Sequence, residues 1–401
     1  MERPAFSVAD VIRAHGAEYL ALRGARVTSR ERRVLNDLGS CRTSLLGGHV
    51  DRCETCEREL ISYNSCRNRH CPTCLAHRSA AWLEERRSEL LPVEYFHVVF
   101  TVPQEVAVLA LGNKKVIFNI LFESVIRTLR KIAVDRRHLG AKIGGLAILH
   151  TWSQLLDFHP HLHCVIPGGG LSQDGSKWVS CRRKFFLPVR ILSRYFRGAF
   201  LARLARARAA GRLHFGRSTG ALADDRNFGS WVAALMKKEW VVYAKRPFGS
   251  PEQVLKYLAR YTHRVAISNS RIVSVADGRV SFRFRDAKRG DATRVTSMAA
   301  SEFLRRFLLH TVPQGFVRIR HFGIFGNRCR KASLARCREL LGAPLVATTN
   351  VDVTAEIESD GGEPNNTRKC KYCGSTHLVP VGVVPYGTPL GATIILRWDT
   401  S

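Results

Sequence analysis

The sequence predicts an α+β fold, with a mixed helix-and-strand domain that follows a small cysteine-rich N-terminal module. Residues 95–103 (YFHVVFTVP) are a β-branched and aromatic run that ends at proline, which is typical of a buried strand. Residues 114–134 place apolar side chains at helical spacing, and residues 158–166 alternate with a period of two. Six of the twelve cysteines fall within residues 41–74, too clustered for a disulfide scaffold.

Charge limits the classes of partner. The 401 residues include 63 Lys and Arg against 33 Asp and Glu, a formal charge of +30. Such an excess repels itself unless a polyanion neutralises it, and nucleic acid is the usual polyanion. No apolar run approaches the roughly 18 residues of a membrane span, and the N-terminus lacks a signal-peptide core. We therefore expect a cytoplasmic protein that binds nucleic acid and no membrane.

Composition divides the chain into three regions. Residues 1–92 contain an N-terminal helix, the cysteine cluster and a charged helix near residues 77–91. Residues 93–330 form the main domain, and residues 331–401 hold a helix, an acidic flexible linker and a short tail. Within the main domain, residues 182–217 carry eleven Arg or Lys and no acid, with apolar side chains at helical spacing. This insertion predicts a basic amphipathic helix that contacts phosphates, although most charged runs are simply solvated faces.

Two further elements follow from turn and cap signals. Ser250-Pro251-Glu252-Gln253 has a capping-box pattern with proline at the first helical position, which predicts a helix to about Thr262. Residues 271–275 and 279–285 flank Asp277-Gly278, which predicts a β-hairpin.

The cysteines have metal-ligand spacing. Two Cys-x2-Cys knuckles separated by fourteen residues can complete a tetrahedron around a structural Zn²⁺. The remaining cysteines and histidines of the segment suggest a second, interleaved zinc site, or simply packing residues. The tail knuckle provides only half a site, which could recruit His377. The expected zinc ligands are Cys53, Cys56, Cys71 and Cys74, the second set is Cys41, His49, Cys66 and His70, and the tail pair is Cys370 and Cys373.

Three histidines alternate along one predicted strand. In residues 158–166, His159, His161 and His163 share one face, while Phe158, Leu162, Cys164 and Ile166 share the other. Two imidazoles two residues apart can bind one metal ion on that face. A third ligand is needed, and Gln154 and His159 are both candidates.

Two tyrosines lie four residues apart on the capped helix and therefore on one face. Taken alone, Tyr257 and Tyr261 would be expected to pack against a sheet. Beside a metal site in a basic protein, a phenol can instead attack a phosphodiester and form a 5′-phosphotyrosine. Lys256 and Arg260 would lower the tyrosine pKa or hold the phosphate.

These segments resemble a known family. HVDRCETC, ISYNSCRNRHCPTC, FHVVFTVP, HTWSQLLDFHPHLHCVIPGGGL, YLARYTHRVAIS and RIRHFG are similar to sequences of the insertion-sequence-91 family of transposases, which are two-tyrosine HUH endonucleases, over about residues 35–327. The resemblance implies an α+β HUH domain whose central antiparallel sheet carries the histidines, with flanking helices and an N-terminal zinc-binding module that contacts DNA.

The resemblance also implies an activity. The enzyme would nick single-stranded element ends and join strands through a 5′-phosphotyrosine in rolling-circle transposition. His161 and His163 would bind Mg²⁺ or Mn²⁺, Tyr257 and Tyr261 would be the nucleophiles, and DNA rather than a small molecule would be the substrate. A bacterial, nucleoid-associated location in the cytoplasm follows.

Other functions share part of this pattern. A rolling-circle replication initiator or relaxase-like nickase has the same histidine strand and tyrosine helix, but the fused cysteine module favours transposition. A non-catalytic zinc-dependent nucleic-acid-binding protein would use the tyrosines only for packing. A DDE-type transposase needs three carboxylates, and only Asp157 and Asp286 are candidates.

Overall fold

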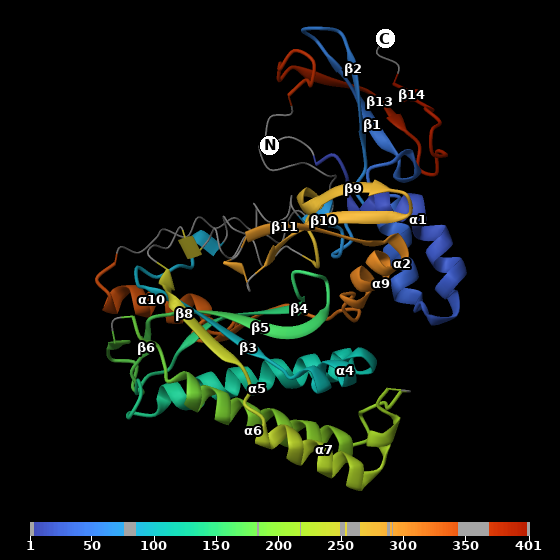
Figure 1. Cartoon of the computed structure of the whole chain (residues 1–401). Coiled ribbons are helices and arrows are strands. Elements are labelled where there is room, and N and C mark those ends of the chain that lie inside the picture. Colours follow the sequence, from blue (N-terminus) through green and yellow to red (C-terminus); the bar gives the residue numbers. More distant parts are fainter. Residues whose placement is uncertain are drawn as a thin grey trace. The chain divides into compact units, whose positions relative to one another are not determined.

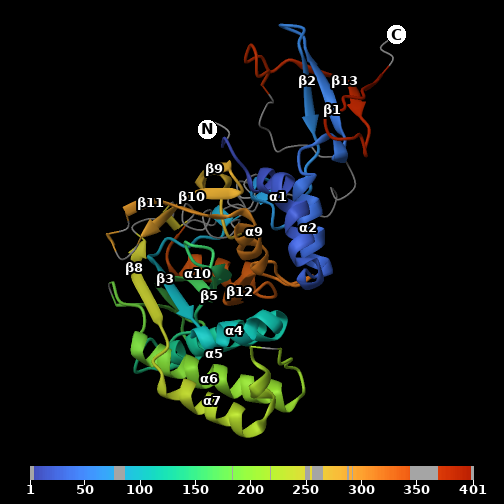
Figure 2. The ribbon, with the colours of Figure 1, turned by 45° about the vertical axis from the view of Figure 1, so that its right-hand side comes forward.

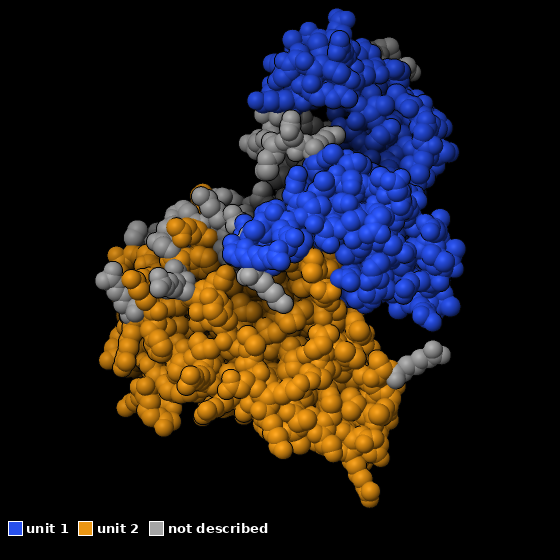
Figure 3. All heavy atoms as spheres, in the orientation of Figure 1, with its two compact units in different colours: residues 1–81, 267–311, 348–401 blue, residues 82–266, 312–347 orange. Residues whose placement is uncertain are grey.

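The computed structural model describes residues 4–75, 86–182, 184–216, 218–248, 253–254, 265–286, 289–290, 292–343 and 369–398. The chain divides into two compact units (Figure 3). Unit 1 combines residues 1–81, 267–311 and 348–401, and unit 2 combines residues 82–266 and 312–347. Each unit therefore combines segments from more than one of the three regions predicted from composition. Among the described helices, none is long and apolar enough to cross a membrane.

Unit 2 is built on a five-stranded antiparallel sheet. Its strand order is β12-β4-β5-β3-β8, so β5 lies at the centre. The strands are β3 (Tyr95–Thr101), β4 (Gly144–Trp152), β5 (Phe158–Pro167), β8 (Val242–Phe248) and β12 (Ile319–Gly323). The short hairpin β6 (Gly169–Leu171) and β7 (Trp178–Ser180) follows β5.

Helices cover one face of this sheet (Figure 1). They include α4 (Gln104–Gly112), α5 (Lys114–Val134) and α6 (Val189–Ala209). Phe158 of β5 contacts Phe118 of α5, and Phe100 of β3 packs edge-on against Phe196 of α6. The apolar register of β5 therefore faces the helices, and its histidine register faces the opposite side.

The expected basic helix is α6. Its apolar side chains Phe196 and Phe200 are fully buried and pack against Trp240, whereas Arg190, Arg194 and Arg206 are exposed. Helix α7 (Asp225–Lys237) begins at Asp224, whose side chain accepts a hydrogen bond from the Asn227 N–H. Helix α10 (Arg330–Leu340) packs through Leu334 with Leu146 of β4, on the histidine side of the sheet.

The described part of unit 1 includes several helices and a three-stranded sheet. Helix α1 (Val8–Arg23) begins at a capping box made by Ser7 and Asp10, and α2 (Ser29–Gly39) begins at another made by Thr28 and Glu31. Both caps satisfy N–H groups that the first helical turn leaves unpaired. Helix α9 (Ala300–Leu309) packs against α1.

The predicted hairpin forms β9 (Ile272–Ala276) and β10 (Arg279–Asp286), and β11 (Ala292–Ala299) extends its sheet. Asp277 and Gly278 both have positive φ, at 51° and 66°, as a two-residue type I′ turn requires.

The second sheet of unit 1 joins the two ends of the sequence. Its order is β14-β13-β1-β2, with β1 (Gly48–Cys53), β2 (Glu59–Tyr63), β13 (Leu378–Val384) and β14 (Leu396–Arg397). In Figure 1 and again in the rotated view of Figure 2, the blue N-terminal strands lie beside the red C-terminal ones. This pairing was absent from the predictions, which left the tail as a separate element.

Candidate active site

Two neighbouring strands bring three histidines together. His150 on β4 lies directly opposite His161 on β5, and His163 lies opposite Ile148 one step further along the ladder. One ring nitrogen from each histidine lies within 4.8 Å of the other two. The ring centroids of His150 and His163 are 4.3 Å apart, and those of His161 and His163 are 4.8 Å apart. Three convergent imidazoles of this kind are a suitable ligand set for a divalent cation.

Hydrogen bonds fix the orientation of two of these rings. The Nδ1–H of His161 donates to the carbonyl oxygen of His159 at 2.6 Å, so the lone pair of His161 is on Nε2. The Nδ1 of His163 lies 2.8 Å from the Nε2 of His97 on β3, and these two rings stack in nearly parallel planes. Partners on the second ring nitrogen are a common feature of metal-ligating histidines.

Burial keeps His97, His161 and His163 uncharged. Burial lowers the pKa of His161 to about 4 and that of His97 to about 3, and it holds the pKa of His163 well below its usual range. These imidazoles are therefore neutral at neutral pH. Because only neutral imidazole binds a metal ion, His161 and His163 can bind a cation without first losing protons.

The third histidine of the cluster differs from the expected ones. Gln154 lies exposed in the turn between β4 and β5, and the ring of His159 is not part of the cluster, although its carbonyl orients His161. His150 takes the third position because β4 and β5 form a hairpin that places it opposite His161. Sequence reasoning overlooked His150 because only strand pairing relates it to the histidine strand.

Further side chains occupy the histidine face. Through the pairing of β3 with β8, Tyr243 and Lys245 lie on the same face as His97, and both are exposed. Val254 is fully buried in a cluster with Tyr95, Ile148 and Val165, which all belong to this face. Val254 therefore packs on the histidine side of the sheet. Tyr257, Tyr261, Lys256 and Arg260 themselves lie outside the described residues.

The cysteines of unit 1 form two clusters, and their grouping corrects the predicted one. The first cluster contains Cys41, Cys66, Cys71 and Cys74, and the second contains Cys53, Cys56, Cys370 and Cys373. The two N-terminal knuckles thus fall in different clusters. Cys53 and Cys56 meet Cys370 and Cys373 because β1, which ends at Cys53, pairs with β13, which follows the tail knuckle.

The two histidines of the expected second set lie outside both clusters. The ring of His49 lies 3.7 Å from the carboxylate of Asp51 on the same strand. His70 is buried, and its backbone N–H donates to the side chain of Asn68, whose amide in turn donates to Asp37. Asn68 therefore shapes the loop that carries Cys66 and Cys71.

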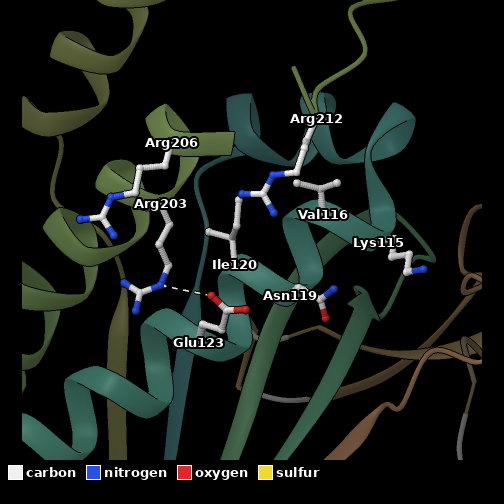
Figure 4. Close-up of a pocket in the computed structure, with 8 residues that line it drawn as sticks. All are labelled: Lys115, Val116, Asn119, Ile120, Glu123, Arg203, Arg206 and Arg212. Atoms are coloured by element: carbon white, nitrogen blue, oxygen red, sulfur yellow. Dashed lines mark hydrogen bonds and ion pairs between the residues drawn. The ribbon is translucent and has the colours of Figure 1, made fainter. Parts of the chain in front are cut away.

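A basic pocket lies between α5 and α6 (Figure 4). It has a volume of about 430 Å³. Arg203 reaches across to Glu123, with 3.3 Å between the guanidinium Nε and the carboxylate. The lining residues are Lys115, Val116, Asn119, Ile120, Glu123, Arg203, Arg206 and Arg212, with four cations and one acid among them.

Not all of the basic insertion is available to a ligand. Arg208 pairs with Asp225, donates to the carbonyls of Leu222 and Ala223 and lies over the ring of Phe228. This arginine therefore stabilises the α6–α7 connection and has a structural role in place of phosphate binding. The exposed arginines of α6 and the pocket residues remain the phosphate-binding candidates.

Comparison with known proteins identifies the family. Residues 144–333 match the family described as "Putative transposase", and residues 11–102 match the transposase zinc-binding domain. "Putative transposase y4qJ" of Sinorhizobium fredii (strain NBRC 101917 / NGR234) is 47% identical over 404 residues, which cover 100% of both chains. The transposase for insertion sequence element IS801 of Pseudomonas savastanoi pv. phaseolicola is 25% identical, over 75% of this chain and 72% of that one.

Among solved structures, the conjugative relaxase TrwC in complex with oriT DNA matches with a TM-score of 0.25 and 16% identity, over 62% of this chain and 74% of that chain. The family assignment depends instead on the sequence matches, one of which spans the whole chain. The chain belongs to the insertion-sequence-91 family of transposases.

Proposed function

We propose that this transposase nicks single-stranded DNA at element ends and rejoins the strands by rolling-circle transposition. In the proposal, His150, His161 and His163 hold Mg²⁺ or Mn²⁺, and Tyr257 and Tyr261 are the nucleophiles. The observation that carries it is the convergence of three imidazoles on the sheet face opposite α4, α5 and α6.

The position of Val254 supports the assignment of the tyrosines. Its side chain contacts the cluster that includes Ile148, the residue paired with His163. Tyr257 follows Val254 by three residues, and three residues span at most about 10 Å. We propose on this ground that the Tyr257 phenol reaches the histidine cluster.

The reaction conserves the phosphodiester bond energy. The tyrosine Oη attacks the phosphorus, the Oη–P bond forms, the P–O3′ bond breaks and the 3′ oxygen leaves as a hydroxyl after taking a proton. A cation on the histidines would polarise the scissile phosphate and stabilise its developing charge. The released 3′-hydroxyl can later attack the phosphotyrosine and regenerate the phenol.

Positively charged side chains on the histidine face would position the DNA backbone. Lys245 is exposed there, beside His97, and was not among the predicted residues. Lys256 and Arg260 keep their proposed roles in holding the phosphate or lowering the tyrosine pKa. Elsewhere in unit 2, the pocket between α5 and α6 offers further cations to the phosphates.

The N-terminal module would bind a structural Zn²⁺ through Cys41, Cys66, Cys71 and Cys74. Pairs of these sulfurs lie 3.6–3.7 Å apart, as expected around a tetrahedral ion. Asn269 ties this knuckle to α1, since its side chain accepts from the Val8 N–H and donates to Thr73. We propose that the module contacts DNA and that the protein works in the bacterial cytoplasm.

The test is a nicking assay on single-stranded element-end oligonucleotide with Mn²⁺ and purified protein. We expect a covalent protein–DNA species that EDTA prevents, together with a free 3′-hydroxyl fragment. Cleavage that leaves no covalent species would refute the tyrosine mechanism. Nicking of origin DNA but not of element ends would instead identify a replication initiator.

A further inference from the structure

We infer that Cys53, Cys56, Cys370 and Cys373 form a second tetrathiolate zinc site, which makes the C-terminal segment 369–398 part of the N-terminal module. The zinc-binding family match covers only residues 11–102, so half of this ligand set lies far outside it. The inference is independent of the proposed nicking reaction.

The sulfur geometry fits a zinc ion. The Sγ atoms of Cys53 and Cys373 are 3.6 Å apart, as are those of Cys56 and Cys370, and all four lie within 4.8 Å of one another. Four sulfurs at about 2.3 Å from Zn²⁺ in a tetrahedron are about 3.8 Å apart. Disulfides would require about 2.05 Å, and the structure has these cysteines as free thiols.

The two knuckles have the same backbone design. The Glu57 N–H donates to the Cys53 carbonyl at 2.8 Å, and the Gly374 N–H donates to the Cys370 carbonyl at 2.9 Å. Glu57 and Gly374 both have positive φ, at 58° and 79°. Each turn therefore aims its two sulfurs at the same point.

One further hydrogen bond closes each knuckle, and it joins equivalent positions in the two. The Cys53 N–H donates to the Arg58 carbonyl at 3.0 Å, and the Cys370 N–H donates to the Ser375 carbonyl at 2.7 Å. Two equivalent knuckles that face each other are an arrangement for a shared ion, because neither supplies more than two ligands alone.

The surrounding sheet holds the knuckles in this register. Cys53 pairs with Leu378 in the β1–β13 ladder, and the Thr55 hydroxyl donates to Ser375 at 2.8 Å. Farther along the sheet, Arg397 forms an ion pair with Glu59 at 2.6 Å. Val50 packs with Val381 and Val384 in a small apolar cluster. So small a core gains substantially from a metal cross-link.

Joining these distant residues has a consequence for assembly. Cys53 and Cys373 are 320 positions apart, so the site cannot form until almost the whole chain has been synthesised. The first cluster, by contrast, is complete at Cys74. The second zinc would therefore close the module only in a finished transposase.

Metal content of the full-length protein tests the site. We expect two zinc ions per chain from the two four-cysteine clusters, and one in the double variant Cys370→Ser/Cys373→Ser. A matched control, Cys181→Ser/Cys329→Ser, changes two cysteines outside both clusters and should retain both ions. A tail variant that keeps the wild-type zinc content would overturn the inference.

A second experiment separates zinc binding from general misfolding. A specific protease site is inserted between residues 350 and 366 of the otherwise unchanged chain, and the purified protein is cleaved there. We expect the C-terminal fragment to co-elute with the rest of the protein and to be released by a zinc chelator. Co-elution of the fragment after complete removal of zinc would contradict the zinc site. Release of the fragment while zinc is still bound would contradict it as well.

Discussion

The histidine cluster of unit 2 and the second cysteine cluster of unit 1 both bring candidate metal ligands together, but from different distances along the chain. His150, His161 and His163 come from adjacent strands of one hairpin, whereas Cys53 and Cys373 lie 320 positions apart. A local cluster depends on one strand pairing, and a distant one depends on the return of the tail to the N-terminal sheet. We therefore expect changes to the histidine face to affect chemistry, and changes to the cysteines to affect folding.

The largest expected effect is on formation of the covalent protein–DNA adduct. The double variant Tyr257→Phe/Tyr261→Phe should abolish the covalent adduct while DNA binding remains, because phenylalanine keeps the ring and removes the nucleophilic oxygen. The measurement is adduct formation on a denaturing gel beside a binding assay.

Tyr243→Phe is the matched control, since Tyr243 is an exposed tyrosine on the same sheet face. It should form adduct at nearly the wild-type rate. If Tyr243→Phe loses the adduct and the double variant keeps it, the nucleophile has been assigned to the wrong residue.

The next effect distinguishes a metal ligand from a neighbour. His150→Ala should reduce nicking by about 100-fold or more, because loss of a ligand weakens both metal binding and its orientation. His159→Ala should cost little, since only its backbone carbonyl is used. Nicking rates across a Mn²⁺ titration would check this, and equal losses in both variants would contradict the role of His150.

Much of unit 2 could be predicted because its signals are local. Helix α5 and strand β5 follow hydrophobic periodicity. In unit 1, likewise, the Asp277-Gly278 turn fixes the β9–β10 hairpin. The third histidine could not be chosen, because it depends on a strand register with an irregularity between His150 and Trp152.

The cysteine grouping was harder still. Knuckle spacing predicts metal ligands, but Cys53 and Cys71 have the same local pattern, Cys-x2-Cys. Only the pairing of β1 with β13 decides that the tail completes one of the two sites. The residue pattern within 369–398 does not identify a partner strand more than 300 positions away.

Acid should destabilise the metal-free protein through the histidine face. His97 and His161 have folded-state pKa values of about 3 and about 4, below the ordinary value of 6.5. The unfolded chain binds these protons first, so the free energy of unfolding falls as pH decreases from about 6.5 towards 4.

Urea unfolding of metal-free wild type and His97→Gln at several pH values would measure this. The variant should lose less stability over that range because it has one fewer depressed histidine. Identical pH slopes for the two proteins would show that His97 does not titrate on unfolding.

The smallest effect concerns the basic helix. Replacing the exposed Arg190, Arg194 and Arg206 by alanine should weaken binding to single-stranded DNA several-fold at moderate salt. It should also reduce the slope of log K against log salt by about 2, if each arginine neutralises one phosphate.

Arg208→Ala provides the contrast, because its side chain is held by α7 and the preceding loop. We expect a lower Tm for this variant with an unchanged salt slope. Fluorescence anisotropy and thermal unfolding distinguish the two results, and an unchanged slope in the triple variant would remove α6 from the DNA-binding surface.

The most direct test of the proposed tyrosine mechanism is mass-spectrometric mapping of the adduct formed on a single-stranded element end with Mn²⁺. A phosphonucleotide on the peptide that contains Tyr257 or Tyr261, absent in EDTA and in His150→Ala, is the predicted result. A nucleotide attached to any other residue, or an adduct that forms at the full rate without metal, would contradict it.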